Sequence, residues 1–213
     1  MSLKTIIEGF EKELEEKVKA REDAISICRK AIALAKHAVM AVHRDELGGA
    51  REKLLEAKKM LKQTDDILVS HKDLSLNIAR VAYQEYAEAE ILLRLVESDK
   101  FPEPEELGVL KIHYILGLAD SIGEFRRRAL ESLRKRNLKV AERCLQIMDE
   151  IYSELIVLES AYSLAPELRR KCDVARRIIE ATIGDVATET RRSSLEETIQ
   201  KLEKLMRKNE KLC

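Results

Sequence analysis

The stretch that decides the fold reads REDAISICRKAIALAKHAVMAVHR and runs from Arg21 to Arg44. Apolar side chains recur in it every three or four positions, and the same stripe begins earlier in the chain. This spacing is typical of an amphipathic helix, so we predict one long helix over about residues 4–43. The stripe consists of Ile7, Phe10, Leu14, Val18, Ile25, Cys28, Ile32, Ala35 and Val39.

Six more helices are expected from the same periodicity and from the residues that interrupt it. Gly48 and Gly49 lie at the break after the first helix, Asp73 or Ser75 is expected to cap the third, and Phe101–Pro104 is the clearest connection. The second and third helices are predicted to end at about His71 and Ser98. The fourth is predicted over about Glu105–Lys135 and the fifth over about Leu138–Leu164. The sixth is predicted to begin at Pro166, and a short final helix to cover residues 193–211.

The composition fits a helical fold and excludes two other classes. The 213 residues include only 7 Gly, 3 Pro and 4% aromatics, too few for the turns and strands of an all-β protein. Hydrophobic residues make up 45%, which is enough for a core and excludes disorder. We therefore expect a single all-α domain over residues 1–213, an elongated seven-helix bundle. Helices this long leave apolar surface that other copies would cover, so we expect a homo-oligomer.

Charge and cysteine usage narrow the class of protein further. Basic and acidic residues both number 39, so a nucleic-acid site would need cations gathered on one face. Cys28, Cys144, Cys172 and Cys213 stand far apart, as expected for reduced thiols in a cytoplasmic protein. The charged N-terminus predicts no signal peptide, and no window of about 18 apolar residues predicts a membrane span.

Two acidic residues interrupt the apolar stripe of the third predicted helix. Glu85 and Glu88 take central positions of the stripe Ile78, Val81, Glu85, Glu88, Leu92 and Leu95. A carboxylate in a core position is costly unless it is paired or binds a cation. The alternative is a rotated helix that places both glutamates at a solvated edge.

A second acidic pair lies in Tyr114–Phe125, which is apolar almost all round. Asp120 and Glu124, four positions apart, share one helix face, and Gly117 and Gly123 indicate that another helix or a ligand approaches closely. His113 continues the face, either as a ligand or base or as an ordinary packed residue.

The two acidic pairs would form a carboxylate cluster if their faces meet. Divalent cations usually relieve the repulsion within such a cluster, and an all-oxygen site suits Mg²⁺ or Mn²⁺. A di-iron site is disfavoured because Glu-x-x-His does not occur. Cations beside the acids make a phosphate-binding surface plausible, although each could equally be an ordinary solvated side chain. They are Arg80, Arg127, Arg128, Arg29 and Lys30, with Arg21, Lys36 and Arg44 also on the first helix.

Two motifs resemble the translin superfamily, and more closely its translin-associated factor X (TRAX) branch. They are VAYQEYAEA over Val81–Ala89 and YILGLADSIGE over Tyr114–Glu124. The resemblance covers about residues 15–186 and leaves the helix over 193–211 outside. It implies a seven-helix fold that assembles into a closed shell around RNA, here an archaeal-type homo-oligomer, an octamer or hexamer.

The resemblance also implies an activity and its residues. TRAX-type subunits are Mg²⁺-dependent endoribonucleases, whereas translin-type subunits bind single-stranded RNA or DNA without cleaving it. The TRAX acidic set corresponds to Glu85, Glu88, Asp120 and Glu124, which would be both catalytic and metal-binding residues. The translin branch has no acid at the position of Asp120, so the resemblance favours the active branch. The family commonly has an acid where this chain has His113.

Overall fold

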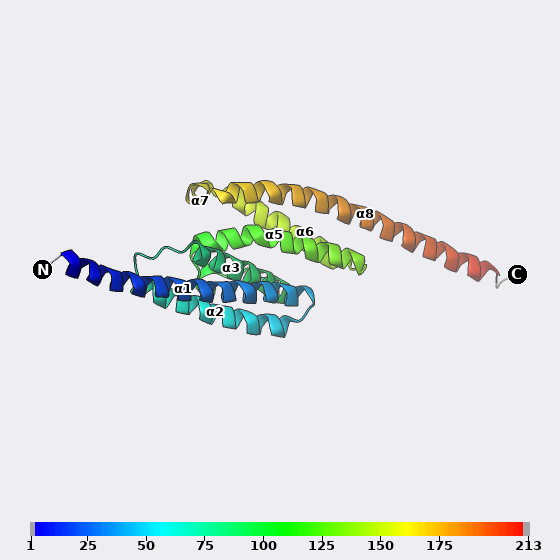
Figure 1. The fold of residues 1–213 in the computed structure, drawn as a ribbon. Helices are drawn as coiled ribbons and strands as arrows, with labels where there is room; N and C mark the ends of the chain where they lie inside the picture. The colour runs from blue at the N-terminus through cyan, green and yellow to red at the C-terminus, as the bar shows by residue number, and fades with distance from the viewer. Residues whose placement is uncertain (1–2, 211–213) are drawn as a thin grey trace. The chain divides into compact units, whose positions relative to one another are not determined.

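The computed structural model describes residues 3–210, and all regular structure in that range is α-helical (Figure 1). The helices are α1 (Leu3–His43), α2 (Leu47–Ser70), α3 (Asn77–Ser98), α4 (Pro104–Leu107), α5 (Lys111–Arg134), α6 (Leu138–Ile156), α7 (Glu159–Leu164) and α8 (Glu167–Glu210). The predicted all-α fold class is confirmed.

The chain divides into two compact units, Met1–Ser121 and Ile122–Cys213, with the boundary inside α5. In the first unit, α1, α2 and α3 pack against one another. In the second, α8 packs against α6 and α7. The expectation of one domain over residues 1–213 stays a prediction.

Small side chains let the helices of the first unit approach closely. The fully buried positions of α1 are mostly alanines, and alanines of α2 and α3 are buried with them. Short side chains at helix contacts allow short interaxial distances. The buried alanines of these three helices include Ala24, Ala31, Ala35, Ala38, Ala50, Ala57, Ala82 and Ala87.

The long helix predicted over residues 4–43 is confirmed as α1, but the first half of its apolar stripe is not buried. Ile7, Phe10, Leu14 and Val18 are between 51% and 58% exposed, and Ala24 is the first buried residue of α1 among those whose side chains are described. These side chains are exposed because α2 is too short to cover the beginning of α1. Asp73, which follows the end of α2, pairs with Lys17 at 2.8 Å, so α1 runs on past its neighbour at this point.

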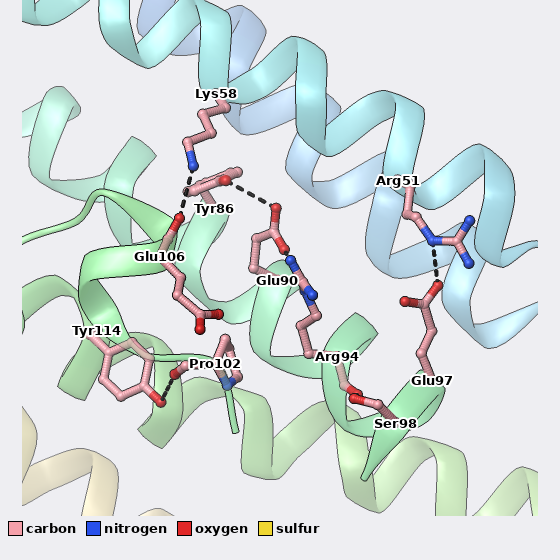
Figure 2. Close-up of polar contacts among 10 residues, drawn as sticks. All are labelled: Arg51, Lys58, Tyr86, Glu90, Arg94, Glu97, Ser98, Pro102, Glu106 and Tyr114. Carbon is pink, nitrogen blue, oxygen red and sulfur yellow. Dashed lines mark hydrogen bonds and ion pairs between the residues drawn. The ribbon is translucent and has the colours of Figure 1, made fainter. Parts of the chain in front are cut away.

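The predicted cap of α3 by Asp73 or Ser75 is absent, because α3 begins at Asn77 and Leu76 takes the N-cap position. Asp73 is engaged by Lys17, and Leu76 precedes the first turn without a side-chain cap. Instead, polar contacts fasten α3 and the chain after it to α2 (Figure 2). Arg51 pairs with Glu97 at 2.7 Å. Lys58 of α2 also donates a hydrogen bond to the Glu106 carbonyl. Two other bonds do not involve α2: Tyr86 donates to Glu90 within α3, and Tyr114 donates to the Pro102 carbonyl.

Three other boundaries differ from prediction, so residues 3–210 form eight helices rather than seven. Gly108, in the left-handed region at φ 73°, ends α4 and separates it from α5. A break at Val157 and Leu158 divides the fifth predicted helix into α6 and α7. Conversely, α8 continues through Ser193 without a new start, because no Gly or Pro interrupts it there. Residue 211, the predicted end, lies outside the described residues.

None of the helices within residues 3–210 combines the length and the apolar character needed to cross a bilayer.

Candidate functional site

The acidic residues of α3 lie at the edge of the core, not within its centre. Glu85 and Glu88 are both half-buried, and Val81 of the same predicted stripe is 44% exposed. Tyr83 and Tyr86 occupy the buried positions instead, because their rings pack in the core while their hydroxyls reach Asp65 and Glu90. The core-stripe prediction is therefore wrong, and the alternative of a rotated helix fits better.

Gly117 brings α5 into direct contact with the acidic turn of α3. A Cβ atom at this glycine would lie 2.9 Å from the Ala87 Cβ and 2.9 Å from the Glu88 backbone nitrogen. Real Cβ atoms do not come so close, so only glycine permits this approach. The predicted close contact at Gly117 is confirmed. At Gly123 a Cβ would meet nothing within 4 Å among the described residues, so the same prediction fails there.

Asp120 follows Gly117 by about one helical turn and faces α3. The side-chain amide of Gln84 donates a hydrogen bond to the Asp120 carboxylate. The contacts at Gly117 and Asp120 place the turn of α3 from Gln84 to Glu88 against the turn of α5 from Gly117 to Asp120. The turns that carry Glu85, Glu88 and Asp120 therefore lie against each other within the first unit, while the clustering of their carboxylates stays a prediction.

Helix α1 adds a cation to this acidic edge. The Lys36 ammonium lies 3.4 Å from the Glu85 carboxylate, and their side chains are 59% and 24% exposed. Gln84 and Lys36 are the two residues at the edge that the predicted site did not include. The sequence offered a signal for Lys36 in the basic residues of α1, but nothing indicated that Gln84 would bind Asp120.

Glu124 is one turn beyond Asp120 on α5 and belongs to the second unit. Its carboxylate lies 4.0 Å from Arg127, whose guanidinium also approaches Glu131 at 3.5 Å. Both partners of Arg127 lie on α5 itself. In this arrangement Arg127 is engaged by acids of its own helix.

The carboxylates as arranged do not fit a bound metal ion. Among residues 3–210, no three Asp, Glu, His or Cys side chains converge in a way that could hold one. The donor chemistry suits a hard cation such as Mg²⁺. However, Lys36 forms an ion pair with Glu85, and the Gln84 amide donates a hydrogen bond to Asp120. The Arg127 guanidinium lies close to Glu124. The assignment of these acids as metal ligands stays a prediction.

His113 is a packed residue in this structure. Its ring is 6% exposed and stacks on Tyr83, with centroids 5.3 Å apart and planes 6° apart. Burial, and to a lesser extent the charge of Arg80, lowers the pKa of His113. Its Nδ1 has no hydrogen-bond partner among the described residues. Of the two interpretations of His113, the structure favours the packed one.

The predicted RNA-contacting cations lie at separate places. Arg80 of α3 is exposed, and so are Arg29 and Lys30 of α1. Arg29 precedes Lys36 by seven positions, about two turns, and so shares its face of the helix, whereas Lys30 is turned by about 100° from Arg29. In the second unit Arg127 is exposed and Arg128 is half-buried. Their role in binding RNA stays a prediction.

Comparisons with known proteins agree with this fold. The family model described as "Translin family" matches residues 68–181. The uncharacterized protein MJ0175 of Methanocaldococcus jannaschii is 30% identical over 192 residues, which cover 89% of this chain and 85% of the relative.

Three solved structures are similar over most of the chain. Each match covers 86% of this chain and 96% of the solved one. AfC3PO is 29% identical with a TM-score of 0.79, and a complex of AfC3PO with duplex RNA is 28% identical with a TM-score of 0.77. The apo form of NeC3PO is 24% identical with a TM-score of 0.77, which supports the fold alone. The TRAX branch stays a prediction, but the family model spans more than half of the sequence, and the chain belongs to the Translin family.

Proposed function

We propose that this chain binds RNA as a homo-oligomer and cleaves it at the carboxylates of α3 and α5. The observation that carries RNA binding is the similarity to AfC3PO, at TM-scores of 0.77 and 0.79, one of whose structures contains duplex RNA. A closed shell, an octamer or hexamer, would cover the apolar side chains that a single chain leaves exposed on α1.

Cleavage is supported by the contact of α3 with α5, whose facing turns carry Glu85, Glu88 and Asp120. Four carboxylates would repel an RNA phosphate unless cations accompany them. Glu85, Glu88, Asp120 and Glu124 are the residues that would hold Mg²⁺ or Mn²⁺. To do so, Glu85 would have to leave Lys36, and Asp120 would have to leave Gln84.

A second candidate function is binding of single-stranded RNA or DNA without cleavage. The partners of the acids favour it, because Lys36 and Gln84 already satisfy Glu85 and Asp120 without a metal ion. Arg29, Lys30 and Arg80, all exposed, would then contact the nucleic-acid backbone.

A cleavage assay separates the two functions. Labelled single-stranded and duplex RNA would be incubated with the oligomer in Mg²⁺, in Mn²⁺ and in EDTA. We expect cleavage only with a divalent ion, and products with 5′-phosphate and 3′-hydroxyl ends if water is the nucleophile.

Replacing Asp120 by Asn is expected to abolish cleavage while RNA affinity stays within a few-fold. Asp120 carries the charge that would hold a cation, whereas Asn keeps its shape. Asp66→Asn on the exposed face of α2 is the matched control and should cleave like the wild type. Cleavage by Asp120→Asn at the wild-type rate would show that the active site lies elsewhere.

A further inference from the structure

We infer that a cavity of the first unit, between α2, α3 and the end of α4, binds a phosphorylated nucleoside. The nucleoside is either a free mononucleotide or the 5′-phosphate end of an RNA strand, and both present the same chemistry. The cavity is lined by residues outside the predicted site. Binding there requires neither a metal ion nor cleavage, so the inference goes beyond the proposed function.

The cavity has the size and the lining of a small-molecule site. Its volume is about 370 Å³, and pockets for small ligands usually measure about 300–1,000 Å³. The buried side chains of Leu61, Tyr86 and Leu107 give it an apolar lining, and the exposed Leu55 borders it as well. A ligand with a flat, partly apolar body, such as a nucleoside, gains by covering these side chains.

Three lysines of α2 border the same cavity, which are Lys58, Lys59 and Lys62. Among the described residues, none of the three pairs with a carboxylate. The Lys58 ammonium instead donates to the Glu106 backbone carbonyl at 2.9 Å (Figure 2). A carbonyl has no net charge, so three positive charges remain without a counter-ion. They suit a terminal phosphate, which carries nearly two negative charges at neutral pH, whereas a phosphate within a strand carries one.

The acids near the cavity are bound by its tyrosines rather than by its lysines. Tyr83 donates a hydrogen bond to Asp65, and Tyr86 donates one to Glu90. Burial, and then the neighbouring carboxylate, raises the pKa of both hydroxyls, so both stay protonated donors at neutral pH. Asp65 borders the cavity and has lone pairs left to accept a hydrogen bond from a ribose hydroxyl.

This polar group favours a nucleotide over a simple apolar anion. A fatty acid also joins a negative charge to an apolar body. However, its chain has no donor for the Asp65 carboxylate, and its single charge matches three lysines less well. A nucleoside phosphate satisfies the lysines, the apolar lining and Asp65 together.

Equilibrium dialysis of the intact oligomer against radiolabelled AMP tests this site. All measurements are made in EDTA, so that no divalent ion takes part. Adenosine, inorganic phosphate and decanoate are compared with AMP as competitors. We expect adenosine and phosphate each to bind at least about tenfold more weakly than AMP, because each makes only part of its contacts.

Two pairs of variants separate the charge of the cavity from its fold. The double variant Lys59→Gln and Lys62→Gln should bind AMP about tenfold more weakly, whereas Lys12→Gln with Lys72→Gln removes two exposed charges elsewhere and should bind like the wild type. Leu55→Glu should abolish binding by repelling the phosphate, and Leu55→Gln, of the same size without the charge, should bind within a few-fold of the wild type. All these positions are exposed, so the melting temperature should hardly change.

Short RNA strands distinguish the two sources of the nucleoside phosphate. If a strand with a 5′-phosphate displaces AMP and the same strand with a 5′-hydroxyl does not, the cavity holds a strand end. If neither displaces AMP, it holds a free nucleotide. Equal displacement by both strands would show that the lysines contact phosphates within the strand, and would overturn the inference.

Failure of this inference can be told apart from failure of the proposed function. The inference is wrong if AMP does not bind at millimolar concentration, if the double lysine variant binds it like the wild type, or if only decanoate binds. RNA binding and cleavage, assayed separately, would be unaffected by these results. Conversely, a wild-type protein that holds AMP but neither binds nor cleaves long RNA would overturn the proposed function alone.

Discussion

At the scale of single residues, His113 makes the stability of the fold depend on pH. It lies buried against Tyr83, with no partner for its Nδ1 in the described part of the chain, and its pKa is lowered from the ordinary 6.5, first by burial and then by Arg80. A histidine whose pKa is lower in the folded state loses stability as the pH falls below 6.5, because the unfolded chain takes up the proton first. Above that pH both states are neutral and the effect disappears.

Replacing His113 by Phe should therefore stabilise the folded protein most at acidic pH. The ring still stacks on Tyr83, and no proton is taken up on unfolding. We expect the free energy of unfolding of the variant to exceed that of the wild type by a margin that widens from pH 7.5 to pH 5, measured by urea denaturation. His37→Gln, at an exposed position of α1, is the control. A margin that stays constant or narrows in acid would contradict this account.

At the scale of helices, Gly117 and Gly123 form a natural comparison within α5. The Gly117→Ala methyl group would meet Ala87 and Glu88 at 2.9 Å, so overpacking should cost about 1–3 kcal/mol of stability despite the better helix propensity of alanine. Gly123→Ala meets nothing within 4 Å among the described residues and should stabilise by about 0.5–1 kcal/mol. Chemical denaturation of both variants measures this difference, and stabilisation by both would mean that α3 and α5 do not meet at Gly117.

These helices also show what the sequence can and cannot predict. The close approach of another helix or a ligand to α5 could be predicted, because Gly117 lies within an apolar helix. The position of Glu85 at the edge of the core was not predictable, since the buried rings of Tyr83 and Tyr86 take the core positions instead. The division between α4 and α5 depends on the left-handed Gly108, one glycine among several with no distinguishing neighbour.

At the scale of the whole molecule, the exposed stripe of α1 tests the proposed assembly. Ile7, Phe10, Leu14 and Val18 are more than half exposed in the single chain, although they continue the apolar stripe of α1. The extent of α2 decides their exposure, and periodicity within α1 carries no information about it. Replacing Phe10 and Leu14 by Gln should lower the mass measured by light scattering, because another copy would no longer gain by covering them. An unchanged mass would place the contacts between copies elsewhere.

The beginning of α1, which extends past the end of α2, has a practical consequence for following assembly in solution. A helical segment without packed neighbours opens locally at little cost, and proteases cut the opened form. Lys12 and Lys19 are exposed in this segment and are trypsin sites. If copies cover the segment, dilution that separates them would make this end susceptible to digestion while the packed alanines from Ala24 onward stay resistant. Digestion from the amino-terminal end would then report how much of the protein is dissociated.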